Sequence, residues 1–210
     1  MIPLTLKLRK QVHKDIAAAQ DVIVKELYKI FDKAVIHGGT AIWRCYNGIR
    51  FSEDVNAYIP KDDAKIGIFF ENLVKSGFSI EKKKVGRNSI YSSLKLGRTI
   101  VRFEALFIKK KGILKEYETA EGHFITIYTL TPEQFIEEKT NAYLKRLKIR
   151  DLYDIFFMLR YVNDKKEIMK DMSRLIKEFR KPIDEQELRV LIIEGITPST
   201  EEIIEYVRRI

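Results

Sequence analysis

The chain has 210 residues, of which 45% are hydrophobic and 33% are charged, with a formal net charge of +9 at pH 7. This length allows one large domain or two small ones with a proper core. The longest apolar runs, at 155–159 and 190–193, are far too short to span a membrane. The single cysteine, Cys45, excludes an internal disulfide and a multi-cysteine metal site. Residues 1–7 lack the apolar core of a signal peptide, so we expect a cytoplasmic location with no membrane partner.

The positive charge has two interpretations. It is typical of a protein that binds a polyanion such as RNA, DNA or the phosphates of a nucleotide. It also arises where Lys and Glu are simply abundant on helix surfaces. Runs of Lys alternate with runs of Glu along this chain, so charge alone does not decide between the two.

Apolar periodicity predicts a helix–strand pattern in the first part of the chain. The apolar run at 34–36 either finishes the first helix or forms a small strand. The expected helices cover 9–32, 40–46 and 63–76, and the first clear strand covers 53–59. The period then changes to two, which predicts strands at 78–85, 89–96, 99–108, 114–119 and 124–130. Their connections have hairpin length, so we expect this part of the sheet to be antiparallel.

Helical signals replace the strands from Thr131 onward. Thr131 is a good N-cap, Pro132 suits the first helical position and Gln134 completes a capping box. Helices are predicted at 132–144, 149–161, 165–180, 184–194 and 198–209. The sequence therefore predicts an α+β fold, with a mixed-sheet domain over 1–130 and a helical domain, a bundle packed against it, over 131–210.

Two segments of the first half have the composition of a nucleotide site. Gly38, Gly39 and Thr40 form a glycine turn that opens a helix, and such a turn can cradle an anion with its backbone N–H groups. Strand alternation places Asp54 and Asn56 on one face, where their oxygens could bind a hard cation.

A third acidic candidate comes from another strand. Glu104 lies on the polar side of the strand predicted at 99–108, and it could join Asp54 in holding one or two Mg²⁺ ions. The alternative is an exposed glutamate paired with its basic neighbour Arg102.

Charged residues also gather in the helical region. Asp151 and Asp154 are three residues apart and share one side of a helix, while Lys139 and Arg150 could contact phosphates. The alternative is an ordinary charged helix surface with ion pairs within the helix.

These motifs, in this order, form one signature. Gly38-Gly39-Thr40-Ala41, Arg50-Phe51-Ser52-Glu53-Asp54-Val55-Asn56, Glu138-Lys139 and Arg150-Asp151-Leu152-Tyr153-Asp154 are its parts. Together they resemble the AbiEii/AbiGii-type nucleotidyltransferases, the toxin components of type IV toxin–antitoxin and phage-abortive systems. The resemblance covers about 34–160.

The resemblance implies a polymerase-beta-like nucleotidyltransferase fold with a helical C-terminal region. It implies an enzyme that uses Mg²⁺ or Mn²⁺ to transfer a nucleoside monophosphate from an NTP to RNA, such as a tRNA end, or to a protein hydroxyl. An antitoxin protein is the implied partner. Carried over by position, Gly38, Gly39 and Thr40 cradle the phosphates, Asp54 binds the metal, Lys139 binds the triphosphate, and Asp151, with Asp154 as its neighbour, is the acid of the last motif. Asp54, Lys139 and Asp151 are then the catalytic group. To these we add Asn56 and Glu104 as metal ligands and Arg150 as a phosphate contact, which are our own inferences.

Asn56 departs from the family pattern, which has a second aspartate there. An amide oxygen can bind a metal but adds no negative charge, so metal binding is expected to weaken. Three hypotheses follow: a slow or single-metal transferase, an impaired relative that binds nucleotide, RNA or a protein, and an unrelated basic α/β binding protein. We expect the transferase.

Overall fold

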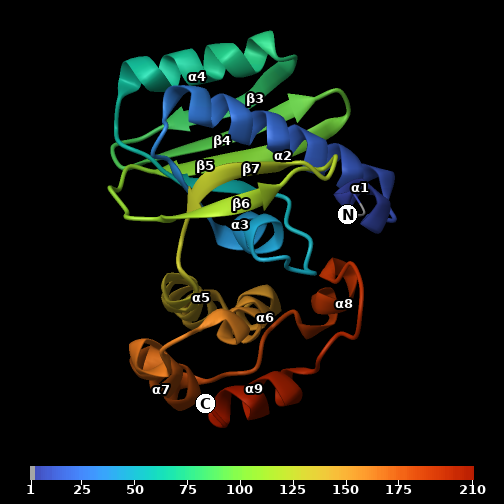
Figure 1. Cartoon of the computed structure of the whole chain (residues 1–210), viewed down its shortest axis with the longest axis vertical. Helices are drawn as coiled ribbons and strands as arrows, with labels where there is room; N and C mark the ends of the chain where they lie inside the picture. The colour runs from blue at the N-terminus through green and yellow to red at the C-terminus, as the bar shows by residue number, and fades with distance from the viewer. Residues whose placement is uncertain (1–2) are drawn as a thin grey trace. The chain divides into compact units, whose positions relative to one another are not determined.

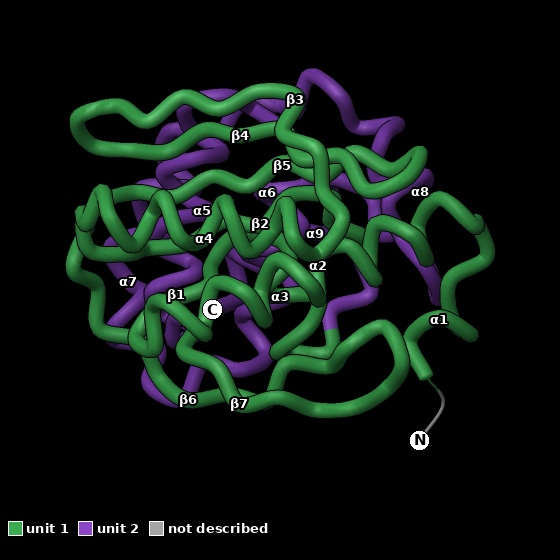
Figure 2. The backbone as a smooth tube through the Cα atoms, turned by 90° about the horizontal axis from the view of Figure 1, so that it is seen from above, with its two compact units in different colours: residues 1–47, 51–129 green, residues 48–50, 130–210 purple. Residues whose placement is uncertain are grey.

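The computed structural model describes residues 3–210, and its contacts divide the chain into two compact units. Unit 1 extends to Asn47 and resumes over Phe51–Thr129, and unit 2 joins Gly48–Arg50 to Leu130–Ile210, as Figure 2 shows in two colours. The predicted domains are 1–130 and 131–210. They place residues 48–50 in the first domain, whereas the contacts place them in unit 2. That these units are independent domains stays a prediction.

Unit 1 is built on a seven-stranded sheet in the order β3-β4-β5-β2-β1-β7-β6. The strands are β1 (Val35–His37), β2 (Val55–Tyr58), β3 (Phe78–Val85), β4 (Ser89–Leu96), β5 (Thr99–Leu106), β6 (Ile113–Glu118) and β7 (Phe124–Thr129). The pairs β2–β5 and β1–β7 are parallel, and the remaining pairs are antiparallel. The sheet is therefore mixed, as the fold class predicted.

Three helices of unit 1, the amphipathic helix α2 (Gln11–Ile30), α3 (Gly38–Cys45) and α4 (Asp63–Lys75), pack on the same face of this sheet (labelled in Figure 1). Arg44 of α3 donates hydrogen bonds to Asp21 of α2 and to the Tyr117 hydroxyl, which lies on this face of β6. Helix α4 begins where the Asp62 carboxylate accepts a hydrogen bond from the Lys65 N–H. The α2/α4 face holds buried side chains such as Phe69, Leu94 and Phe103. A short helix, α1 (Leu4–Lys7), precedes α2 and was not predicted.

Two predictions for the sheet are wrong. The connection from β5 to β6 is not a hairpin, because β5 pairs with β2 and β7 pairs with β1 in parallel. Strand periodicity shows where strands occur but not which strands pair. The strand predicted at 53–59 is shorter, so Asp54 lies immediately before β2. The apolar run at 34–36 contributes to strand β1.

Unit 2 is helical. Its elements are α5 (Pro132–Arg146), α6 (Ile149–Met158), η1 (Leu159–Tyr161), η2 (Lys165–Ile168), α7 (Met169–Glu178), η3 (Glu185–Glu187), α8 (Leu188–Leu191) and α9 (Thr200–Arg208). The capping box of Thr131 and Gln134 is confirmed, and Leu147 ends α5 in the left-handed conformation with φ 52°. The helix predicted at 184–194 is wrong in extent, because a short 3₁₀ turn and one α turn replace it.

The helices of residues 3–210 are all too short or too polar to cross a membrane. The cytoplasmic location stays a prediction. The fold class is confirmed as an α+β arrangement with a mixed sheet followed by a helical C-terminal part.

Candidate active site

The glycine turn leads directly from β1 into α3. Gly38 has φ +74°, and a Cβ atom there would lie 2.9 Å from Asn56 Nδ2. The positive φ favours glycine here, and a Cβ atom would also displace the Asn56 amide. His37 stacks on Tyr58, with ring centroids 4.0 Å apart, and does not cap α3 with its side chain. Because the first N–H groups of a helix have no partner within the helix, the start of α3 offers donors next to Asn56.

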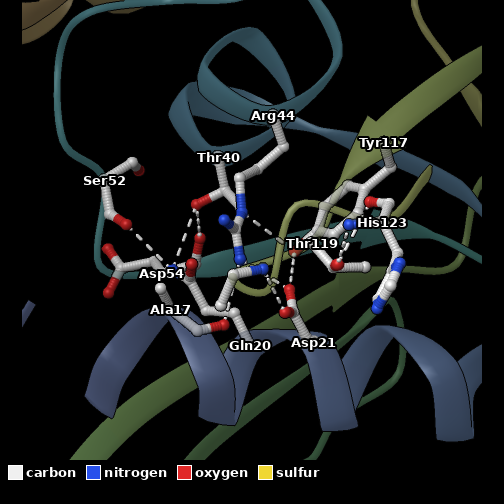
Figure 3. Close-up of polar contacts among 11 residues, drawn as sticks. Ala17, Gln20, Asp21, Thr40, Arg44, Ser52, Asp54, Tyr117, Thr119 and His123 are labelled. Atoms are coloured by element: carbon white, nitrogen blue, oxygen red, sulfur yellow. Dashed lines mark hydrogen bonds and ion pairs between the residues drawn. The ribbon is translucent and has the colours of Figure 1, made fainter. Parts of the chain in front are cut away.

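Thr40 has a different role from the one its position suggested. Its side chain is buried, and Thr40 Oγ1 donates a hydrogen bond to the backbone oxygen of Asp54 at 2.5 Å. Figure 3 shows both residues in one polar cluster beneath α3. The hydroxyl therefore holds the chain that carries Asp54, while phosphate binding by the backbone of this turn stays a prediction.

Gln20 of α2 supports the same segment. Gln20 Nε2 donates to the Ser52 backbone oxygen at 2.8 Å and lies 3.4 Å from Thr40 Oγ1 (Figure 3). The side chain is fully buried, so the bonds form away from water. Sequence reasoning missed this residue, although a glutamine among the apolar positions of an amphipathic helix was a usable signal.

The acidic candidates lie on neighbouring strands. Asn56 of β2 and Glu104 of β5 are direct partners in the parallel register, so their side chains point to the same face. The Asp54 carboxylate lies at the same face, because it accepts hydrogen bonds from Arg102, which is two residues before Glu104 on β5. The structure therefore brings Asp54, Asn56 and Glu104 together on one face of the sheet in unit 1.

Arg102 occupies both oxygens of Asp54. Arg102 Nε donates to Oδ1 and Nη2 donates to Oδ2, each at 2.8 Å. The Arg102 side chain is 44% exposed and that of Asp54 is 22% exposed. The hydrogen bonds to Asp54 raise the pKa of the Arg102 guanidinium above its ordinary value, so it stays charged. The sequence alternative paired Arg102 with Glu104. In the structure Arg102 pairs with Asp54.

The donor set on this face fits a hard divalent cation by type. Asp54 and Glu104 supply carboxylate oxygens, and Asn56 supplies an amide oxygen, which are ligands that Mg²⁺ accepts. Within residues 3–210, no group of three His, Cys, Asp or Glu side chains gathers closely enough to hold a metal. Since one of the three donors is an amide, the set carries two negative charges.

The charged residues of the helical region form a buried charge network within unit 2, made of Arg50, Lys139, Asp151 and Asp154. Lys139 Nζ lies 3.2 Å from Asp151 Oδ1 and 2.6 Å from Asp154 Oδ2. Arg50 Nε donates to Asp154 Oδ1 at 2.7 Å, and Arg50 Nη2 donates to Asp154 Oδ2 at 2.8 Å. Each of the four residues is 7% exposed or less. Arg146, which is half-exposed along its side chain, completes the partners of Asp151.

The network fixes the charge of both acids. Burial would raise the pKa of Asp151, but Lys139 and Arg146 outweigh it and hold this pKa below its ordinary value. Burial acts likewise on Asp154, where Arg50 and Lys139 outweigh it and lower the pKa. Both carboxylates are therefore charged at neutral pH.

The structure brings Lys139 and Asp151 together, but two carboxylates already engage the lysine. Arg150, also predicted to bind nucleotide, lies half-buried on α6 next to Asp151. The roles of Lys139, Arg150 and Asp151 toward a nucleotide stay predictions. Arg50 had no role assigned from the sequence, because the pairing of Arg50 with Asp154 joins positions 104 residues apart.

Comparison with known proteins identifies the family. Among curated proteins, no sequence matches this chain. The solved structures include two similar folds from Helicobacter pylori. JHP933 is 18% identical with a TM-score of 0.63, over 95% of this chain and 92% of that one. A candidate nucleotidyltransferase is 18% identical with a TM-score of 0.62, over 95% of each chain. At this identity the likeness concerns the fold alone.

The sequence profile of the family "Nucleotidyl transferase AbiEii toxin, Type IV TA system" matches residues 25–202. The match includes the glycine turn, the Asp54 segment and the buried charge network. It extends beyond the residues of the resemblance at both ends. The chain belongs to the AbiEii nucleotidyl transferase toxin family of type IV toxin–antitoxin systems.

Proposed function

We propose that this protein transfers a nucleoside monophosphate from an NTP to an RNA hydroxyl, with a divalent cation at the face that carries Asp54, Asn56 and Glu104. The observation that carries the proposal is the position of Asn56. It lies against Gly38 at the start of α3 and beside Glu104 on β5, so backbone N–H groups of α3 lie near the amide and carboxylate oxygens of β2 and β5. Nucleotidyl transfer requires both.

The residues of this face would position the reactants. The acceptor hydroxyl oxygen attacks the α-phosphorus and forms a P–O bond, and the hydroxyl proton passes to solvent water. The bond from that phosphorus to the bridging oxygen breaks, and pyrophosphate leaves. The N–H groups at the start of α3 would bind phosphate oxygens. A bound divalent cation would neutralise charge that develops on the phosphates. Thr40 and Gln20 would hold the Asp54 segment in place.

A basic groove in unit 1 favours RNA over a protein as the acceptor. Lys82, Lys84 and Tyr91 line a groove of about 370 Å³ on one face of the β3–β4 hairpin. Lys82 Nζ lies 5.2 Å from the centre of the Tyr91 ring, and both lysines are exposed. Tyr91 is the register partner of Glu104, so the groove borders the acidic candidates. Lysines with an aromatic ring suit a single-stranded nucleic acid, because they bind phosphates and stack a base.

Transfer of label from each α-labelled NTP to total tRNA, with Mg²⁺ or Mn²⁺, tests the proposal. We expect label on RNA, and more of it with Asn56→Asp, since that change restores a charge to the donor set. Absence of transfer with every NTP and both metals would overturn the proposal.

A second candidate function is binding without catalysis. It is favoured by Asn56, which lacks a charge, and by Asp54, whose carboxylate Arg102 occupies. Measurable NTP or RNA binding without transfer, in both the wild type and Asn56→Asp, would support this function. In either case, membership of a toxin family supports an antitoxin protein as partner. Copurification with the product of an adjacent gene would test that partner.

A further inference from the structure

We propose that the Arg102 guanidinium competes with metal ions for the Asp54 carboxylate, so that the chain binds one divalent cation at this face. This inference rests on the proposed nucleotidyl-transfer site. It assigns to Arg102 a role in setting the number and affinity of bound metal ions.

The contact between Arg102 and Asp54 is the first basis. Two N–H groups of Arg102 fill both oxygens of the Asp54 carboxylate at 2.8 Å. A bidentate pair of this kind is directional and stronger than a single ionic contact. A metal ion that used Asp54 would have to displace it. The oxygens of Asn56 and Glu104 thus remain for a divalent cation.

The charge of the face is the second basis. Asp54 and Glu104 each carry one negative charge, Arg102 carries one positive charge, and Asn56 carries none. Two divalent cations would bring four positive charges to a face whose own charges sum to minus one. Two-metal sites rely on carboxylates to neutralise the ions. The amide at Asn56 and the guanidinium at Arg102 both reduce the negative charge of this face, so the affinity for a second divalent cation is lower.

Arg102 differs in position from the basic residues Lys82 and Arg98 of unit 1. Lys82 pairs in register with Ser93, and Ser93 pairs with Arg102, so Lys82 lies two strands from Arg102. Arg98 lies in the exposed turn between β4 and β5. Arg98 therefore offers a matched arginine on the same hairpin that makes no ion pair with Asp54.

Titration with Mn²⁺ alone, followed by the electron paramagnetic resonance signal of the free ion, tests the inference without any reaction. We expect one Mn²⁺ per wild-type chain. Arg102→Gln should bind Mn²⁺ about five- to ten-fold more tightly, which corresponds to about 1–1.4 kcal/mol. The double variant Arg102→Gln with Asn56→Asp should bind two ions.

Arg98→Gln is the matched control and should leave Mn²⁺ affinity within about two-fold of the wild type. Because Arg102 is half-exposed, the melting temperature of Arg102→Gln should stay within about 4 °C of the wild type. Two ions of similar affinity in the wild type, no tighter binding in Arg102→Gln than in Arg98→Gln, or no binding in either would overturn the inference. One ion and tighter binding in Arg102→Gln, without label transfer to RNA, would uphold it and refute the proposed function.

Discussion

The two ion-pair arrangements of this protein differ in how far their charged side chains are exposed to solvent. In unit 2, Arg50 and Lys139 neutralise Asp151 and Asp154 at 7% exposure or less. In unit 1, Arg102 binds Asp54 with a side chain that is 44% exposed. A buried charge without a partner is costly, whereas an exposed pair exchanges readily with water and ions. We therefore expect the network of unit 2 to stabilise the fold, and the pair of unit 1 to remain accessible to ions.

The same substitution at both arginines should separate these roles most strongly. Arg50→Met leaves Asp154 buried with one cation fewer, so the free energy of unfolding should fall by about 3–5 kcal/mol. Arg102→Met should lower it by about 1 kcal/mol or less. Urea unfolding of both variants gives the comparison. Equal losses would show that burial does not distinguish the two pairs.

Acid should weaken the buried charge network. The folded-state pKa values of Asp151 and Asp154 lie below their ordinary value, so the unfolded chain takes up protons first as the pH falls. The stabilisation is fully present above the unfolded pKa of about 3.9 and is lost as the pH falls through the folded values. Urea unfolding at pH 7, 5, 4 and 3 measures this loss.

Arg50→Met provides the control for that series. It removes a cation that lowers the pKa of Asp154, so the stability difference between wild type and variant should shrink toward pH 3. A difference that stays constant or grows from pH 5 to pH 3 would contradict the assignment of these charges.

A smaller effect should follow from the hydroxyl of Thr40. Thr40→Val keeps the side-chain shape but leaves the Asp54 backbone oxygen without its donor, at a cost of about 1–3 kcal/mol. Thr40→Ser retains the donor and should lose less. Urea unfolding measures both variants. If Thr40→Val were as stable as Thr40→Ser, the hydrogen bond would not hold the Asp54 segment.

Local signals made much of this fold predictable. The capping box at Thr131 marked the start of α5, and apolar periodicity located α2 and most strands. Strand pairing was not predictable in the same way, because β2 and β5 are joined by a register that local sequence does not encode. The same limit explains the expectation of an antiparallel connection between β5 and β6.

The candidate site was predictable by residue type but not by partner. The glycine turn, Asp54, Asn56 and Glu104 were identified, because their chemistry and spacing are visible in the sequence. The Arg102–Asp54 pair and the Arg50–Asp154 pair were not, since they join positions 48 and 104 residues apart. Only the fold brings such positions into contact.

The most direct test of the central claim is the transfer of α-labelled NTP to total tRNA by Asp54→Asn and its matched control Asp62→Asn. Asp62 caps α4 and has no role in the proposed chemistry. We predict that Asp54→Asn lowers the rate of transfer by about 10²–10³-fold, because it removes a charge from the reacting face, while Asp62→Asn retains activity. Transfer by Asp54→Asn at the rate of the wild type would contradict the account.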